Sequence, residues 1–426
     1  MDENMKMTFT IVTLQHAPQI DISGSYEIVV KTYLQVLVAF GATCNVNESG
    51  EIKCQGERYQ SYSQSIKDNL LKLIPINNVF GKLYEIFKNM DLGNPFAFFP
   101  QTLSDEDISS VRNEMLKRFL GNKYPNFESY YNDTWKDIHD NYELFFFKNG
   151  HNNTTEIGEK EKGKRICRFC GEKQPTTTFE NKSHSISEAL GNKNIVTNDE
   201  CDNCNKSFGE GIELDLIYML DFFRTYYGVQ GKGGLKKFSS SNNFEISRDN
   251  SSNVTSIKIH DDNLEIDDKN NIKIQLKHPQ KINLQNIYRA LVKYALSVLD
   301  DSYLKDFEET IKWIKCERSF DKLSWITILL TNQICDTFPE ISVYIRKNEN
   351  KDLPYSFMIL ELNGLKMVAI LPLCSKDDHC FNDKGEFEKF WSFLKPCHQI
   401  PILKRFKPQI NESQEFTYCI NMTQNK

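Results

Sequence analysis

The chain has 426 residues, of which 39% are hydrophobic and 12% aromatic, so it can bury more than one core and is not a disordered protein. Its formal net charge of -6 excludes nucleic-acid binding through an overall basic field and leaves only local patches for such contacts. No stretch approaches the ~18 consecutive apolar residues of a membrane helix, and the first residues lack a signal-peptide pattern. We therefore expect a soluble, cytoplasmic protein without membrane contact.

The first 150 residues are predicted to form a mainly helical domain whose role the sequence does not indicate. Apolar residues recur at helical spacing from Tyr26 to Val38, and Gly41 ends this helix. Helical spacing returns between Tyr62 and Phe87. Residues 43–58 read as a hairpin that turns at residues 47–50. Ser104 followed by Asp107 resembles a capping box that opens another helix.

The remaining chain is predicted to hold a linker, a cysteine-rich module and an α+β region. Residues 151–164 are polar and charged, as expected of a linker, and the module covers residues 165–234. In the region 235–426, alternating apolar residues indicate a small strand meander, followed by amphipathic helices and by a hairpin at Asn363-Gly364. The fold class is therefore α+β and multidomain, with the module in the centre.

Four of the 12 cysteines form two Cys-x-x-Cys pairs, Cys167/Cys170 and Cys201/Cys204. A short turn between paired thiolates brings both sulfurs to one side of a metal, so the two pairs predict a structural Zn²⁺ site. We expect the other eight cysteines to be reduced, and most of them to lie in the core.

The chain between the two cysteine pairs can leave the metal, form a small hairpin and return. His184 lies in a segment that can be a short strand, Leu190-Gly191-Asn192 supplies a turn, and residues 194–196 can return as a second strand. Apolar residues then recur at helical spacing after Asn205. The order is strand, loop, strand and helix.

The segment CRFCGEKQPTTTFENKSHSISEALGNKNIVTNDECDNCNKSFG resembles the HNH endonuclease family, in its zinc-stabilised subset with two Cys-x-x-Cys pairs. The resemblance covers about 70 residues, from Arg165 to Gly234. It implies a ββα-metal nuclease in which His184 is the general base that activates water. It also implies that Asn194, or alternatively Asn198, pins the loop, and that Asn205 is a ligand of a catalytic divalent cation.

Such a cation would be Mg²⁺ or Mn²⁺, because oxygen ligands suit a hard ion whereas thiolates suit zinc. The family usually has a carboxylate or histidine metal ligand directly before the base, but this chain has Ser183. The missing charge could come from Glu180, Glu210 or Glu213, and Glu213 lies about two helical turns beyond Asn205. We therefore take Ser183, Asn205 and Glu213 as candidate ligands of the catalytic ion.

Positively charged residues gather around the module and could grip phosphates. The candidates for nucleic-acid contact are Lys164, Arg165, Arg168, Lys182, Lys193 and Lys232. DNA is the expected substrate, with RNA as an alternative.

The predicted function is that of an HNH endonuclease that cleaves DNA by divalent-metal-assisted hydrolysis, with a histidine general base. The resemblance further implies a role in restriction or phage defence. The alternative is a non-catalytic zinc-containing module that binds nucleic acid or another protein. The sequence indicates neither protein partners nor an oligomeric state.

Overall fold

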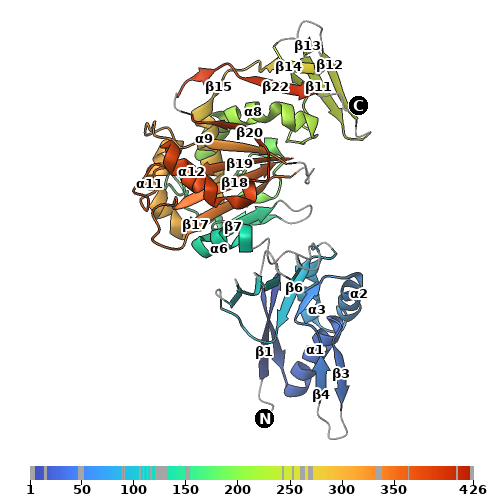
Figure 1. Ribbon diagram of the computed structural model, residues 1–426. Coiled ribbons are helices and arrows are strands. Elements are labelled where there is room, and N and C mark those ends of the chain that lie inside the picture. The colour runs from blue at the N-terminus through green and yellow to red at the C-terminus, as the bar shows by residue number, and fades with distance from the viewer. Residues whose placement is uncertain are drawn as a thin grey trace. The chain divides into compact units, whose positions relative to one another are not determined.

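The computed structural model divides the chain into two compact units, Met1–Asp133 and Thr134–Lys426. The structure describes residues 5–13, 17–46, 52–88, 90, 92–104, 107, 108, 110–112, 114, 115, 118, 119, 132–148, 154–241, 244–251, 254–259, 264–266, 272–331, 338–362, 364–408 and 411–422. The fold is mixed α/β (Figure 1). Among the described residues, no helix combines the length and apolar composition that crossing a membrane requires.

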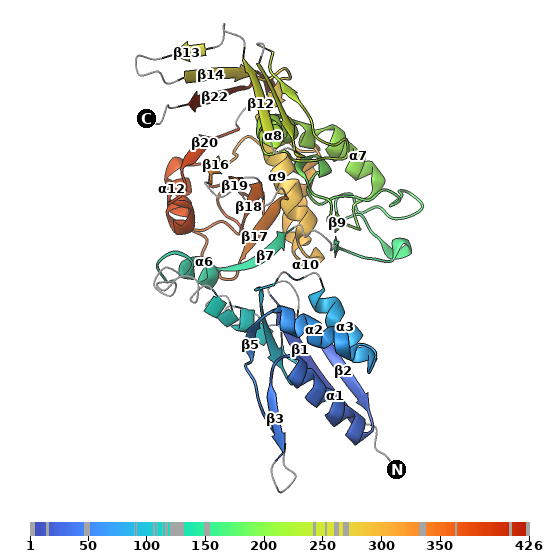
Figure 2. The same cartoon turned by 90° about the vertical axis from the view of Figure 1, so that its right-hand side faces the viewer.

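The first unit is built on an antiparallel sheet covered by helices. Its strands, in spatial order, are β2 (Gln19–Gly24), β1 (Met5–Thr13), β6 (Pro95–Phe99) and β5 (Tyr59–Ser61). The helices on one face of this sheet are α1 (Tyr26–Ala39), α2 (Gln64–Leu73) and α3 (Asn78–Phe87) (Figure 2). Phe9 and Ile11 of β1 point into the core under these helices, whereas Val12 packs with Phe99 on the opposite face.

The prediction of a mainly helical N-terminal domain is wrong, because residues 5–24 form two strands. The run Thr-Phe-Thr-Ile-Val-Thr alternates in the period of a strand and is rich in β-branched residues, which favour sheets. The three predicted helices between Tyr26 and Phe87 are confirmed. The capping box is also present, with Asp107 N–H donating to Ser104 Oγ at 3.1 Å and the Ser104 hydroxyl donating to Asp107 Oδ2 at 2.7 Å.

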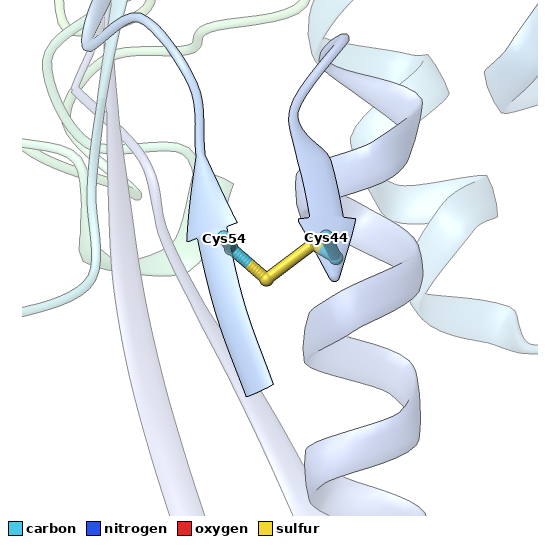
Figure 3. Close-up of a disulfide and its surroundings, with 2 residues drawn as sticks. All are labelled: Cys44 and Cys54. Carbon is cyan, nitrogen blue, oxygen red and sulfur yellow. A yellow bond between two sulfur atoms is a disulfide. The ribbon is translucent and has the colours of Figure 1, made fainter. Parts of the chain in front are cut away.

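The predicted hairpin after α1 is formed by β3 (Thr43–Val46) and β4 (Ile52–Gln55). The antiparallel register places Cys44 opposite Cys54, and the two are joined by a disulfide (Figure 3). The prediction that all cysteines outside the two pairs are reduced is therefore wrong for this pair. The predicted turn, Asn47–Gly50, lies outside the described residues.

An antiparallel sheet also forms the centre of the second unit. Its strands, in spatial order, are β20 (Ile402–Phe406), β16 (Ile326–Leu330), β19 (Leu365–Ile370), β18 (Ser356–Leu362), β17 (Glu340–Arg346) and β7 (Tyr142–Lys148). The pairing of β18 with β19 confirms the hairpin predicted around Gly364, which has a positive φ of 80°. Asn363, the other predicted turn residue, lies outside the described part of the chain.

Helices cover both faces of this sheet (Figure 2). One face packs against α9 (Leu284–Val298) and α11 (Glu308–Ile314), which follow each other through the short α10 (Asp301–Leu304). The other face packs against α12 (Lys384–Phe393) and α6 (Lys136–Asn141). Along β18, Met358 and Leu360 belong to the core under α9, whereas Phe357 belongs to the core under α12, as the strand period requires.

The strands predicted between residues 244 and 276 exist, but they do not form one meander. They divide between two sheets, one in the order β10 (Phe238–Ser239), β11 (Phe244–Asp249) and β12 (Val254–Ile259), the other in the order β13 (Leu264–Ile266), β14 (Ile272–Lys277) and β22 (Thr417–Met422). A further pair joins β15 (Ile282–Asn283) to β21 (Ser413–Gln414). Two C-terminal strands thus pair with strands that precede α9.

The cysteine module, residues 165–234, contains β9 (Ile195–Thr197), α7 (Asp202–Glu210) and α8 (Ile212–Tyr226). Strand β8 (Thr155–Ile157) comes from the predicted linker and pairs in parallel with β9. Buried residues of the module, such as Phe208 and Leu216, belong to the same core as α9 and the large sheet. The module is therefore packed into the second unit.

The compact division at residues 133/134 differs from the predicted boundary at residue 150. The reason is β7, which pairs along its whole length with β17 although it was assigned by sequence to the first domain. Tyr142 at its start is buried, and its hydroxyl donates to the Pro354 carbonyl at 2.7 Å. Of the predicted linker 151–164, residues 151–153 lie outside the described residues.

We expect a fragment of residues 134–426 to fold, and a fragment of residues 151–426 to aggregate. Removal of β7 exposes the hydrogen-bonding edge of β17 and opens the core under α12, and an exposed hydrophobic edge promotes aggregation. Size-exclusion chromatography and thermal melting of both fragments test this. Equal solubility and melting of the two fragments would contradict it.

Candidate functional site

The predicted order of strand, loop, strand and helix is present in the cysteine module. The backbone at Ser183 and Ser185 pairs with β9, since Thr197 N–H donates to the Ser183 carbonyl and Ser185 N–H donates to the Ile195 carbonyl, both at 3.0 Å. His184 lies between these two bonds, opposite Val196. The chain then passes the buried residues Asp199 and Glu200 and enters α7 at Cys201.

Asn192 crosses the loop between the two strand segments. Its side-chain amide donates to the carbonyls of Ile186 at 2.9 Å and Ile195 at 2.8 Å, and its Oδ1 accepts from Ile195 N–H at 2.9 Å. It is 0% exposed. The sequence prediction gave the loop-pinning role to Asn194, but the Asn194 backbone N–H itself donates to Asn192 Oδ1 at 3.2 Å. The cross-loop bonds are thus made by the residue that follows Gly191, whose φ of 91° forms the turn.

The four cysteines of the two pairs meet at one point. One ligand atom from each of Cys167, Cys170, Cys201 and Cys204 lies within 4.8 Å of the others. The Sγ atoms of Cys170 and Cys201 are 3.7 Å apart. A tetrahedral zinc with Zn–S bonds of about 2.3 Å requires sulfurs about 3.8 Å apart, so this spacing fits zinc.

Electrostatics within the cluster favour a thiolate. The Cys204 side chain, and then the backbone N–H groups of neighbouring residues, lower the pKa of the Cys167 thiol to about 5. Backbone N–H groups also reach the sulfurs, with Cys201 N–H 3.4 Å from Cys167 Sγ and Cys204 N–H 3.5 Å from Cys201 Sγ. Both pairs therefore form turns that can hold a cation.

His184 is placed to accept a proton. Its side chain is 17% exposed, and Nε2 lies 3.9 Å from Glu188 Oε2. Burial, followed by the positive charge of Lys182, lowers the pKa of His184, so the neutral imidazole is favoured near pH 7. Its Nδ1 is buried and has no hydrogen-bond partner among the described residues.

Ser183 and Asn205, two predicted ligands of a catalytic ion, lie together. The Ser183 hydroxyl is 3.4 Å from Asn205 Oδ1, and Asn205 stands half-buried on the first turn of α7. Both side chains offer oxygen atoms, which suit a hard divalent cation.

Glu213, the third predicted ligand, makes a different contact. The prediction placed it on the face of Asn205 along one continuous helix, but the helix is interrupted at Gly211, which separates α7 from α8. A side chain at Gly211 would meet the Ser207 carbonyl oxygen at 2.8 Å, so the break depends on glycine. Glu213 Oε1 instead lies 3.1 Å from Nζ of Lys293, a residue of α9.

Lys293 also binds a second buried carboxylate that the sequence prediction missed. Its Nζ lies 3.1 Å from Glu200 Oε2 and 3.5 Å from the His184 carbonyl. Burial by itself lowers the pKa of Lys293, but the two carboxylates outweigh it and raise this pKa, so the ammonium stays charged. Burial raises the pKa of Glu200, against the opposing effect of Lys293. A local signal for Glu200 exists only in its position before Cys201.

The other two carboxylates considered from sequence are exposed. Glu180 forms an ion pair with Lys162 at 2.7 Å, and Glu210 lies at the exposed end of α7.

Most of the predicted phosphate-binding side chains are at the surface. Lys164, Lys182, Lys193 and Lys232 are exposed, and Arg165 is half-buried and donates to backbone carbonyls of residues 159 and 160. Lys182 Nζ donates to the Lys193 carbonyl at 3.1 Å, so these two residues are neighbours. The positive charges of Lys182 and Lys232 act on His184.

Arg168 is an exception, because its side chain is only 1% exposed and cannot reach a phosphate. Its guanidinium forms a bidentate pair with Asp199 at 2.8 and 2.9 Å. It also donates to carbonyls at the end of α9, those of Leu296, Ser297 and Leu299, at 2.9 to 3.2 Å. Carbonyls in the last turn of a helix lack partners within it and attract cations, which explains the buried position. A count of charges along the sequence could not distinguish this arginine from its exposed neighbours.

Comparison with known proteins identifies this segment. Residues 167–221 match the family model described as HNH endonuclease. No curated protein and no solved structure matches the chain significantly. The matched segment contains the four cysteines, the loop and the two helices, but it ends before Lys293.

We expect the wild-type chain to bind one zinc ion and Cys201→Ser to lose it. Metal binding supplies several kcal/mol of folding free energy in small zinc modules. Because the module shares its core with α9, the loss should lower the melting temperature of the second unit as well. Metal analysis and differential scanning calorimetry measure both effects, and Cys419→Ser, an exposed cysteine outside the cluster, is the control. A zinc-free variant that melts like the wild type would contradict this expectation.

We expect Arg168→Ala to destabilise the second unit by about 3–5 kcal/mol, because it leaves the Asp199 carboxylate buried without its cation. Urea denaturation of the full chain measures the loss. The control is Lys164→Ala at an exposed side chain, which should change the stability by less than about 0.5 kcal/mol. Equal stability of the two variants would show that the buried pair contributes nothing.

Proposed function

Residues 167–221 form a domain of the HNH endonuclease family, and from this premise we propose that the chain cleaves phosphodiester bonds of DNA by metal-assisted hydrolysis. One observation carries the proposal. A half-buried histidine with a lowered pKa stands beside a pair of oxygen ligands, Ser183 and Asn205, inside the segment that the family model matches.

In this proposal His184 is the general base. The neutral imidazole takes a proton from the attacking water, and its lowered pKa keeps it unprotonated near pH 7. The Asn192 bonds fix the loop that follows His184, so the ring is held by backbone on both sides. Asn194 remains a proposed member of the catalytic loop through its backbone contact with Asn192.

Asn205 and Ser183 would hold Mg²⁺ or Mn²⁺ through their side-chain oxygens. When bound, such an ion stabilises the negative charge that grows on the leaving oxygen. The four cysteines hold zinc in a separate, structural role, because a site closed by four thiolates has no open position for a substrate.

The substrate is drawn to the site by exposed lysines. Lys182, Lys193 and Lys232 would contact phosphates next to His184, with Lys164 and Arg165 at the margin. Because the whole chain is acidic, binding depends on this patch and should weaken steeply with salt. We further propose a role in restriction or phage defence, in which the first unit and the small sheets recognise a target or a partner.

A specific observation favours a second function. Position 183 holds serine where the family usually has a charged or imidazole ligand, as expected for a module that binds nucleic acid without cleaving it. The two functions differ in whether cleavage accompanies binding.

We expect the wild-type chain to nick supercoiled plasmid in Mg²⁺ or Mn²⁺, and His184→Ala to be slower by a factor of about 10²–10⁴. Both should bind a DNA duplex with equal affinity in a gel-shift titration, because the variant keeps the lysines. His379→Ala, at an exposed histidine outside the module, is the control and should cleave normally.

Equal cleavage by wild type and His184→Ala would remove His184 from the mechanism. Salt-dependent binding without cleavage by the wild type would favour the non-catalytic module. A labelled RNA of the same sequence, tested in parallel, decides between the two substrates.

A further inference from the structure

Two carboxylates and one ammonium are buried together directly behind the proposed cation ligands. Glu200 and Glu213 are 1% and 6% exposed, and Lys293 is 0% exposed. Lys293 Nζ lies 3.1 Å from one oxygen of each carboxylate. One cation faces two anions, so the group holds one negative charge or one proton in excess.

The excess is concentrated at Glu200. Its two carboxylate oxygens are buried and accept no well-aligned hydrogen bond from a described residue, apart from the approach of Lys293. A buried carboxylate in this state is costly unless a further cation or donor compensates it. Glu213 has no such unsatisfied oxygen among the described residues.

Ser183 connects this carboxylate to the proposed cation position. Its side chain, 2% exposed as a residue, interacts with the Glu200 carboxylate on one side and lies 3.4 Å from Asn205 Oδ1 on the other. The hydroxyl can direct its proton toward Glu200 and its lone pairs toward an ion beside Asn205. The negative charge that is absent from position 183 is thus available one layer deeper.

We propose that Glu200, held by Lys293 of α9, is the positioning residue that supplies negative charge to the divalent cation through Ser183. The inference rests on the proposed nuclease function. It accounts for the serine at position 183, and it makes α9, which lies beyond the matched residues 167–221, a part of the nuclease site.

The test measures Mn²⁺ binding to the zinc-loaded full chain, by the electron paramagnetic resonance signal of free Mn²⁺, beside plasmid nicking. Glu200→Gln should weaken Mn²⁺ binding ~10- to 100-fold, the loss that removal of a residue behind a metal ligand commonly causes. Glu180→Gln, at an exposed carboxylate of the same module, is the matched control and should bind Mn²⁺ like the wild type.

A compensating variant separates charge supply from a merely structural role. Ser183→Asp combined with Glu200→Gln returns the carboxylate to position 183, so it should restore Mn²⁺ affinity to within about threefold of wild type if charge supply is the function. Ser183→Ala covers the case in which Glu200→Gln fails to fold, because it removes only the connecting hydroxyl. It should weaken Mn²⁺ binding about tenfold with unchanged zinc content.

The outcomes distinguish this inference from the nuclease function. A wild type that cleaves, with Glu200→Gln binding Mn²⁺ as tightly, overturns the role of Glu200 alone. Loss of Mn²⁺ binding in Glu200→Gln that the added aspartate does not restore overturns it too, since the carboxylate is then structural. If Glu200→Gln does not fold, wild-type Mn²⁺ affinity in Ser183→Ala overturns it. A wild type that neither binds Mn²⁺ nor cleaves overturns both proposals.

Discussion

Asp199 and Glu200 are consecutive, and each binds a buried cation across the boundary between the cysteine module and α9. Arg168 reaches from the module to Asp199 and to the last carbonyls of α9, while Lys293 reaches from α9 to Glu200. The contacts are reciprocal, because each side contributes one cation. Removal of either cation leaves a buried charge, which commonly costs several kcal/mol. The position of the module on α9 is therefore fixed by electrostatics as well as by packing.

This attachment determines the geometry around His184. Lys293 lies 3.5 Å from the His184 carbonyl, and Thr197 of the paired strand donates to the Ser297 carbonyl of α9 at 3.2 Å. The backbone that presents the proposed base is thus bonded to a helix whose other side packs on the large sheet. A site held this way keeps its groups at fixed distances, which general-base catalysis requires.

Local patterns made part of this arrangement predictable from sequence. Cysteines two residues apart, a histidine between the pairs and a glycine turn act over a few residues, so the strand, loop, strand and helix order followed from spacing. The structure confirms that order, the cysteine cluster and the proximity of Ser183 to Asn205. The strand pattern of residues 5–13 was also visible in the sequence, but the helical spacing that follows it dominated the prediction.

Tertiary features accounted for the rest. The burial of Arg168 depends on the end of α9, and the role of Glu200 depends on Lys293, and neither contact leaves a local trace. Glu213 was misplaced because the interruption at Gly211 rotates α8 relative to α7. The exchange of Asn194 for Asn192 arose from the same limit, since only the coordinates show which amide spans the loop.

The chain combines a disulfide in one unit with a cluster of four thiols in the other. Cys170 Sγ and Cys201 Sγ are only 3.7 Å apart, so an oxidant could join them with little movement while they carry no metal. Coordination to zinc occupies the thiolates that would react. The order of assembly therefore matters: zinc must enter the module before oxidation closes the Cys44–Cys54 hairpin, or the wrong pair of cysteines competes for the same oxidant.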